Sequence, residues 1–197
     1  MSSFFDMLSA AMYAIIVQNL VFSGGYGLSE AMRMAARPKR LFSAAGMIVW
    51  FSTLSSVVCS LLDSLEIISS KSASVHFLIY TAVLLAVYFI TCGATAILLK
   101  PGRKLMSNFG MAALNTLVLA IPLINHRSSS TIWESIGTGF GSGIAFIFAA
   151  LLMSAGFAKL SENKKIPPAF KGAPVMFIYA AMLSLTFIGL SGSLTFA

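Results

Sequence analysis

Two stretches of this sequence decide its fold: residues 18–25 read QNLVFSGG, and residues 114–119 read LNTLVL. In each stretch an asparagine, Asn19 or Asn115, interrupts an apolar segment, and Gly24 and Gly25 follow the first one. Paired interruptions in two halves of a chain are typical of membrane folds with a binding site near the bilayer midplane. We therefore expect Asn19, Gly24, Gly25 and Asn115 to line a pocket at that depth.

The composition places the chain in the membrane class. Of its 197 residues 58% are hydrophobic and only 10% are charged, and the mean hydropathy is +0.90. A soluble domain has about 25% charged residues, so a soluble protein is excluded. The net charge of +7 lies in short loops, without a basic face interleaved with aromatic residues, so nucleic-acid binding is not expected.

Six apolar segments are candidates to cross the membrane: residues 7–22, 41–62, 77–99, 106–124, 136–158 and 173–196. All but the first approach the roughly 20 residues that a bilayer requires. The sequence thus predicts an all-α membrane protein with six transmembrane helices, the first and fourth of which are interrupted. No soluble domain is expected, so residues 1–197 form a single membrane domain.

The six segments form two related halves, residues about 1–100 and 101–197. Gly46 in the second segment pairs with Gly143 in the fifth, and Tyr80 in the third pairs with Tyr179 in the sixth, at closely similar offsets. A half with three crossings must face the other way from its copy, which makes an inverted repeat. In that arrangement the two interruptions meet near the midplane.

Two interpretations of the interruptions remain open. The polar groups at Asn19 and Asn115 either line an ion or cofactor path or form hydrogen bonds between packed helices. The glycines after Asn19 either turn the chain back toward the midplane or end a short helix. A carboxylate in the middle of a span would mark a proton relay, and the sequence has none there.

The positive charges predict the orientation. All of the 13 Lys and Arg residues except Lys71 and Arg127 fall in the first, third and fifth loops. The positive-inside rule places these loops in the cytoplasm and both termini outside a cytoplasmic (inner) membrane. The N-terminal stretch has no basic region, so we expect a retained helix and not a cleaved signal peptide.

The remaining candidate residues predict packing and no metal site. Cys59 and Cys92 lie at different depths and are expected to be separate buried apolar residues. His76 and His126 are expected in outer loops without ligand-spaced partners. The alternating glycines of residues 137–143 predict a close approach of helices.

Residues 166–172 (IPPAFKG) and the apolar run 180–192 resemble the C-terminal signature of the RnfA/NqrE-type membrane subunits. Residues 115–160 and the run from residue 17 to residue 47 also follow that pattern, so the resemblance covers nearly the whole chain. It implies six helices in two inverted halves, paired with a homologous RnfE/NqrD-like subunit of opposite topology. It also implies a complex that couples electron transfer between ferredoxin or NADH and other carriers to Na⁺ or H⁺ translocation.

The resemblance further implies a 2Fe–2S cluster held by one cysteine in each broken segment of each subunit. Ser29 and Thr116 occupy those two positions here. Hydroxyl groups are harder and less acidic ligands than thiols, so we do not expect them to hold a stable cluster. No cofactor is therefore predicted, although the fold and the partner subunits are. The alternative function is a small non-redox transporter or ion conduit on the same scaffold.

Overall fold

The computed structural model describes residues 2–37, 41–65, 72–99 and 103–195. Throughout this part the chain forms helices and no strand. The helices are α1 (Ser2–Ile16), α2 (Leu20–Ser23), α3 (Leu28–Ala35), α4 (Leu41–Asp63), α6 (Ala73–Leu99), α7 (Arg103–Ala113), α8 (Thr116–Arg127), α9 (Ile132–Glu162), the 3₁₀ turn η2 (Pro168–Phe170) and α10 (Ala173–Thr195).

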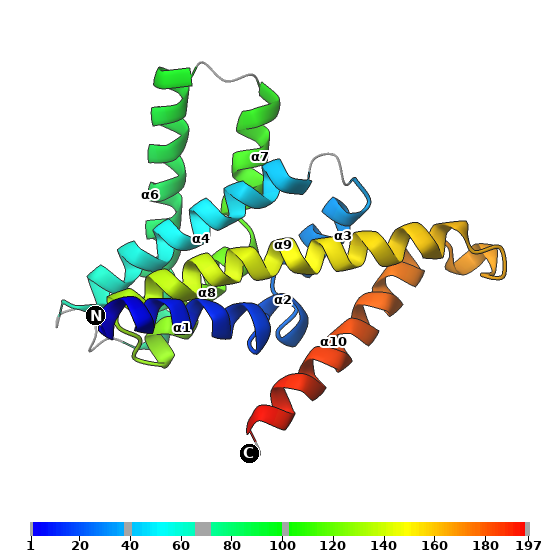
Figure 1. Cartoon of the computed structure of the whole chain (residues 1–197). Coiled ribbons are helices and arrows are strands. Elements are labelled where there is room, and N and C mark those ends of the chain that lie inside the picture. Colours follow the sequence, from blue (N-terminus) through cyan, green and yellow to red (C-terminus); the bar gives the residue numbers. More distant parts are fainter. Residues whose placement is uncertain (1, 38–40, 66–71, 100–102, 196–197) are drawn as a thin grey trace.

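Helix α9 forms the centre of the bundle, and α1 and α4 pack along it (Figure 1). Its glycines alternate between these two neighbours. A Cβ atom on Gly137 or Gly141 would lie 2.2 Å or 2.5 Å from a backbone oxygen of α1. One on Gly139 or Gly143 would lie 2.9 Å or 2.7 Å from the backbone of α4. The predicted close approach is therefore confirmed, because a larger residue at any of the four positions would push a helix away.

Serine hydroxyls connect α4 to α9 at the same interface. Ser52 Oγ donates to the carbonyl oxygen of Gly139 at 2.9 Å, and Ser56 Oγ donates to that of Ser135 at 2.7 Å. Such bonds between helices satisfy polar groups that lipid cannot. At the start of α9, Thr131 and Glu134 form a capping box.

Among the described residues, four helical stretches are long and apolar enough to cross a membrane: Leu41–Asp63, Ala73–Leu98, Asn108–Arg127 and Ile132–Glu162. Ser3–Ile16 and Ala173–Gly189 are shorter apolar helices. The chain is therefore an all-helical integral membrane protein. The first helix begins at Ser2 and ends at Ile16, whereas the apolar pattern predicted residues 7–22, because the helix breaks at the polar pair that follows Val17.

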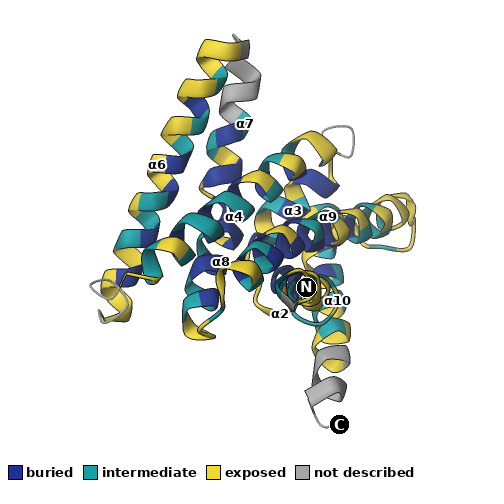
Figure 2. Cartoon of the chain, turned by 60° about the vertical axis from the view of Figure 1, so that its left-hand side comes forward, coloured by how far each residue is buried: buried dark blue, intermediate teal, exposed yellow. Residues whose placement is uncertain are grey.

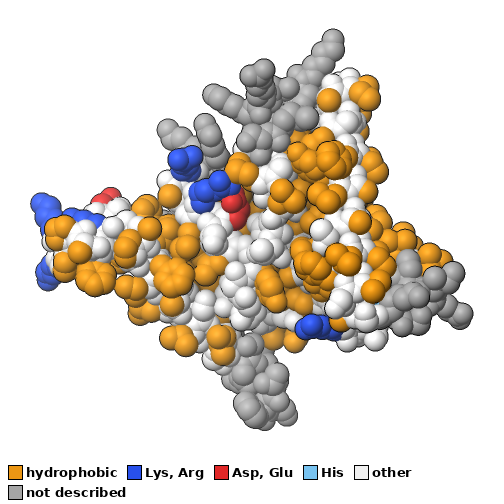
Figure 3. All heavy atoms as spheres, turned by 180° about the vertical axis from the view of Figure 1, so that it is seen from behind, with side chains coloured by type: hydrophobic (Ala, Val, Ile, Leu, Met, Phe, Trp, Pro, Cys, Tyr) orange, Lys and Arg blue, Asp and Glu red, His pale blue; other side chains and the backbone are white. Residues whose placement is uncertain are grey.

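Apolar side chains cover much of the outside of the bundle. Exposed residues follow α6 and α10 (Figure 2), where Phe89, Ile90 and Leu185 are each about two-thirds or more exposed. Seen from behind, hydrophobic side chains spread over most of this face, and Lys and Arg gather where α9 leads into α10 (Figure 3). Such a surface suits lipid tails or an apolar partner. Cys59 and Cys92 are buried and unpaired, as predicted.

Candidate functional site

The first interruption lies between α1 and α3. Asn19 is fully buried, and its side-chain oxygen accepts a hydrogen bond from the amide of Val21 at 3.2 Å, which caps the short helix α2. The ring of Phe22 in α2 stacks on that of Phe187 in α10, with centroids 4.7 Å apart. The asparagine therefore starts a new helix, and packing against α10 holds that helix in place.

Glycines then lead the chain from α2 into α3. Gly25 and Gly27 have φ angles of +70° and +73°, in the left-handed region that side chains disfavour. Gly27 also lies close to the second interruption, since a Cβ atom there would be 2.8 Å from Asn115 Oδ1. The glycines thus end the short helix α2, as one interpretation predicted, and turn the chain toward the second interruption. A turn back toward the midplane stays a prediction.

The second interruption lies between α7 and α8 and consists of Leu114 and Asn115. The side-chain oxygen of Asn115 accepts a hydrogen bond from the amide of Leu117 at 2.9 Å and caps α8. Asn19 makes the corresponding bond to the amide two residues after it. The two asparagines therefore play the same local role in the two halves of the chain.

A hydrogen bond joins the two interruptions. The amide of Gly27 donates to Thr116 Oγ1 at 2.9 Å. Thr116 and Ser29, which comes two residues after Gly27, are both exposed. The glycine turn before Ser29 therefore contacts Thr116. The side chains of Ser29 and Thr116 both lie at the surface of the chain.

The two asparagine amides differ in their remaining contacts. Asn19 Nδ2 donates to the carbonyl oxygen of Ala145 in α9 at 3.4 Å. Asn115 Nδ2 is buried and has no hydrogen-bond partner in the described part of the chain. A buried donor without a partner is unfavourable. Asn115 therefore has an unused hydrogen-bond donor, whereas Asn19 has none at its side-chain amide.

The residues around the interruptions do not fit an iron–sulfur cluster. Ser29 and Thr116 offer hydroxyl oxygens, and the Thr116 oxygen already accepts a bond from Gly27. The only two thiols of the chain, Cys59 and Cys92, are buried in α4 and α6. Clusters of this kind require thiolates, with imidazole in some classes, and neither group is present at these positions.

A hollow of about 240 Å³ lined by Tyr26 and Thr116, among others, lies at the interruptions, and two further hollows lie beside α1 and α3. A cavity of about 500 Å³ between α1, α8 and α9 is lined by Gln18, Asn125 and Thr138, among others. Inside it, Thr138 Oγ1 donates to Asn125 Oδ1 at 2.9 Å, and Asn125 Nδ2 donates to Ser56 Oγ at 2.7 Å. A smaller hollow of about 70 Å³ lies beside Glu30 and Arg33 of α3. Polar groups therefore reach from the bundle end at α8 and α9 to Gln18, which adjoins Asn19.

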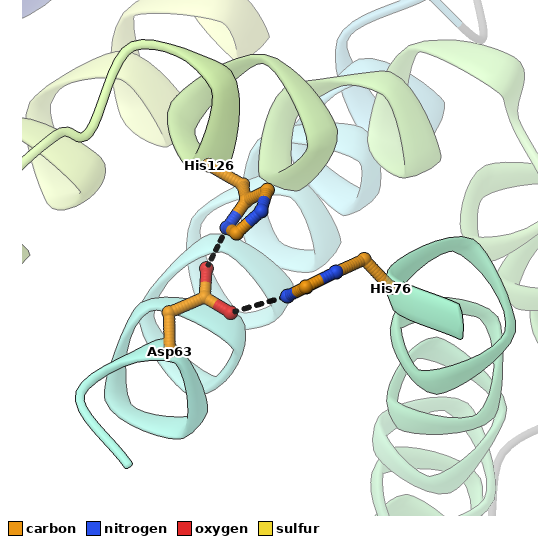
Figure 4. Close-up of side chains that lie close together, drawn as sticks. All are labelled: Asp63, His76 and His126. Atoms are coloured by element: carbon orange, nitrogen blue, oxygen red, sulfur yellow. Dashed lines mark hydrogen bonds and ion pairs between the residues drawn. The ribbon is translucent and has the colours of Figure 1, made fainter. Parts of the chain in front are cut away.

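The prediction for the two histidines was wrong. His76 lies in the first turn of α6 and His126 in the last turn of α8, and both approach Asp63 at the end of α4 (Figure 4). His126 Nδ1 is 3.3 Å from Asp63 Oδ2, and His76 Nε2 is 3.9 Å from Asp63 Oδ1. Sequence spacing gave no signal of this cluster, because its members come from three helices.

Comparison with known proteins identifies a family. A model of the family described as "Rnf-Nqr subunit, membrane protein" matches residues 7–194, which is nearly the whole chain. This match includes both interruptions.

Full-length relatives carry related names. The chain is 25% identical over 191 residues to a subunit of the ion-translocating oxidoreductase complex of Colwellia psychrerythraea, covering 95% of this chain and 97% of the relative. It is 29% identical to the corresponding subunit of the proton-translocating ferredoxin:NAD(+) oxidoreductase complex of Clostridium ljungdahlii, covering 92% and 94%. It is 25% identical to that of the Na(+)-translocating ferredoxin:NAD(+) oxidoreductase complex of Acetobacterium woodii, covering 98% of each chain.

Proposed function

The chain belongs to the Rnf-Nqr family of membrane subunits, and from this membership we propose that it works as a membrane subunit of an ion-translocating electron transport complex. The observation that carries the proposal is the match over residues 7–194, together with three relatives that align over nearly their full length. The complex would couple electron transfer from ferredoxin or NADH to the movement of Na⁺ or H⁺. The relatives' names differ in the ion, since one names the proton and another names Na(+).

We propose that the chain crosses the membrane six times, as two inverted halves of about residues 1–100 and 101–197. The matching caps at Asn19 and Asn115 support this arrangement, since each starts a helix after an interruption. The distribution of Lys and Arg supports a cytoplasmic membrane with both termini outside. The interruptions then lie near the midplane, where irregular backbone needs protein or water around it.

The surface beside the interruptions supports a partner protein from the same complex. Leu114 is 67% exposed and Tyr26 is 38% exposed, and Thr116 lies exposed with them. Exposed polar groups and irregular backbone at this depth are unfavourable against lipid. We infer that a homologous subunit of opposite topology, RnfE/NqrD-like, covers this face, with further subunits of the complex beyond it.

An ion path through the chain has support from the polar groups of the bundle. The cavity with Asn125 and Thr138 opens on the proposed outer side, and Gln18 connects it to the first interruption. Asn115 Nδ2 offers an unused donor at the second interruption. Glu134, at the start of α9, is the one carboxylate among the residues that line this cavity, and from there inward carbonyl and hydroxyl oxygens would carry a cation.

The residues at the two interruptions also bear on whether this chain itself carries electrons. Because Ser29 and Thr116 do not fit a cluster, we propose that this subunit contributes scaffold and ion path, and that other subunits carry the electrons. The same observation favours the second candidate, a non-redox ion conduit or small transporter. Neighbouring genes for flavin-, nicotinamide- or ferredoxin-binding subunits would favour the complex, and an isolated gene would favour the conduit.

Reconstitution tests the proposal. The complex is purified through a tag on this chain and placed in sealed vesicles, and Na⁺ and H⁺ movement is followed while reduced ferredoxin or NADH is oxidised. We expect electron-transfer subunits to copurify and one of the two ions to move. Copurification with no such subunit, or electron transfer without ion movement, contradicts the proposal.

Matched variants then test the path. Thr138→Val removes a hydroxyl from the cavity, and Thr186→Val removes one from the exposed face of α10, where it bonds only to its own helix. We expect Thr138→Val to slow ion movement several-fold and Thr186→Val to leave it unchanged. Equal rates of ion movement in the two variants would show that the cavity is not part of the ion path.

A further inference from the structure

Three side chains that can bind metals converge at one end of the bundle. Asp63, His76 and His126 each offer one ligand atom, and these atoms all lie within 4.8 Å of one another. The imidazole rings of the two histidines stack with centroids 3.8 Å apart, so both approach the carboxylate from neighbouring positions (Figure 4). The cluster lies apart from both helix interruptions and does not depend on the proposed function.

The hydrogen bonds of His76 leave one nitrogen free. Its Nδ1 lies 3.0 Å from the carbonyl oxygen of Ser72, and since a carbonyl can only accept, Nδ1 carries the hydrogen. Nε2 of the neutral ring then bears a lone pair, which faces the oxygen of Asp63 at 3.9 Å. This nitrogen is buried and has no hydrogen-bond partner in the described residues. A buried nitrogen lone pair that faces a carboxylate oxygen is unfavourable unless a proton or a cation lies between them.

The surroundings resemble the support that proteins give to metal ligands. A ligating histidine usually donates its other N–H to a carbonyl or carboxylate, as His76 does to Ser72. Tyr80 is buried and donates its hydroxyl to the Asp63 carboxylate, 2.6 Å from Oδ1. That bond fixes the orientation of the carboxylate while its remaining lone pairs face the histidines. Each of these contacts therefore holds a potential ligand in place.

We propose that Asp63, His76 and His126 bind a divalent transition-metal cation, Zn²⁺ by preference. Two imidazoles and a carboxylate are common zinc ligands, at about 2.0–2.2 Å from the metal, which in a tetrahedron sets ligand atoms about 3.3 Å apart. The His126–Asp63 pair already has that separation, at 3.3 Å, and His76 would move less than about 1 Å toward Asp63 from its 3.9 Å. A cavity of about 410 Å³, lined by Asp63 and His126 among others, gives access for the ion and for a water as fourth ligand.

A cation at this place would connect the two halves of the chain. Asp63 ends α4 and His76 begins α6 in the first half, whereas His126 belongs to α8 in the second half. The ion would therefore hold the ends of three helices together. In the proposed orientation this end faces the outside, where the ion could be taken up directly.

The test uses the full chain, purified in detergent with a tag that contains no histidine and stripped with a chelator. Co²⁺ is the probe, because tetrahedral Co²⁺ with nitrogen and oxygen ligands absorbs visible light strongly, and Zn²⁺ is then added in competition. The chain contains only two histidines, so imidazole ligation of Co²⁺ can arise only from this cluster. We expect a tetrahedral spectrum with one Co²⁺ per chain and its loss on addition of one equivalent of Zn²⁺.

Variants assign the ligands. We expect His126→Gln and Asp63→Asn to abolish the spectrum, Tyr80→Phe to weaken binding about 10-fold by freeing the carboxylate, and the exposed-acid control Asp6→Asn to bind normally. To separate binding from folding, thermal unfolding of each variant is compared with Zn²⁺ and with chelator. Zn²⁺ should raise the midpoint of the native chain and of Asp6→Asn, but not that of His126→Gln.

Two results would overturn the proposal. An octahedral or absent Co²⁺ spectrum in the folded native chain would mean that only a proton lies between the histidine and the carboxylate. Equal binding by the native chain and by folded His126→Gln would mean that the ion sits elsewhere. Either outcome leaves the cluster as a set of hydrogen bonds that ties α4, α6 and α8 together.

Discussion

The two helix interruptions begin in the same way and continue differently. Asn19 and Asn115 each accept a hydrogen bond from the amide two residues later. After Asn115 the chain runs straight into α8, whereas after Asn19 it forms the short helix α2 and a turn with two left-handed glycines before α3. The capping asparagine is therefore common to both halves, and the glycine turn belongs to the first half alone.

This difference explains how the interruptions come together. The turn places the amide of Gly27 on the hydroxyl of Thr116, and it leaves no room for a side chain at residue 27. The second interruption supplies the start of α8, and the first supplies the glycine turn that meets it. Substitutions at the two interruptions should therefore have unequal effects.

The largest effect is expected from Gly27→Ala. The new Cβ would lie 2.8 Å from Asn115 Oδ1 at a φ angle of +73°, so the variant combines backbone strain with a displaced helix cap. We expect it to lower the free energy of unfolding by about 2–3 kcal/mol. Gly25→Ala is the matched control, because its φ angle of +70° is similar but nothing lies within 4 Å of the new Cβ. It should lose only about 1–2 kcal/mol.

The same variant allows a coupling measurement. In the double variant with Asn115→Ala, the colliding amide atoms are gone, so part of the Gly27→Ala loss should disappear. We expect a coupling free energy of at least about 0.5 kcal/mol from chemical unfolding in detergent. Strictly additive losses would show that the two interruptions do not touch.

The next effect concerns the bond that joins the interruptions. Thr116→Val keeps the shape of the side chain but leaves the amide of Gly27 without its acceptor. We expect a loss of about 1–2 kcal/mol, while Thr116→Ser retains the oxygen and stays near the native value. A loss in Thr116→Ser as large as that in Thr116→Val would contradict the hydrogen bond as the source of the stability, because serine retains the accepting oxygen.

A smaller effect is expected from the two caps. Asn19→Ala removes the cap of α2 and the bond to Ala145, and should lower the free energy of unfolding by about 1 kcal/mol. Asn115→Ala also removes a buried amide that has no partner in the described residues, which offsets part of the lost cap. We therefore expect Asn115→Ala to be the milder change in stability. A larger loss at Asn115 than at Asn19 would contradict the absence of a partner for the Asn115 amide in the described residues.

The smallest effect is expected at Ser29, which is exposed and whose side chain makes no hydrogen bond within the described part of the chain. Ser29→Ala should change the stability of the isolated chain by less than about 0.5 kcal/mol. The loss measured for Thr116→Val is the comparison, since the resemblance gives both residues the same role. Losses of equal size at the two positions would contradict the different contacts described for them.

Local patterns made much of this molecule predictable. The interruptions at Asn19 and Asn115 and the glycine run of α9 each depend on neighbouring residues, and all appear in the structure. Of the six predicted apolar segments, four appear in the described part of the chain as helices long enough to cross a membrane. The bond between Gly27 and Thr116 could not be predicted as such, because it requires the detailed path of a glycine turn. The cluster of Asp63, His76 and His126 was missed because three separate helices supply it. A polar residue near one helix end does not indicate a cluster in the sequence, because its partners are known only once the positions of the other helices are known.

The chain belongs to the Rnf-Nqr family, and Ser29 and Thr116 stand where the resemblance implies cluster-binding thiolates. A positive control is the double variant Ser29→Cys with Thr116→Cys, which restores the thiolates at both positions. Purified with the partner of opposite topology, this variant should gain iron relative to the native chain. Without such a gain, an absence of iron in the native pair could not be assigned to these two residues.

The most direct test is iron analysis and EPR spectroscopy of the native chain, purified with its partner of opposite topology and reduced before measurement. The account predicts no stoichiometric iron in the pair and no signal of a reduced 2Fe–2S cluster, because the hydroxyls of Ser29 and Thr116 are poor ligands for such a cluster. About two iron atoms per pair with that signal would contradict it, and would return the electron-relay role to this chain.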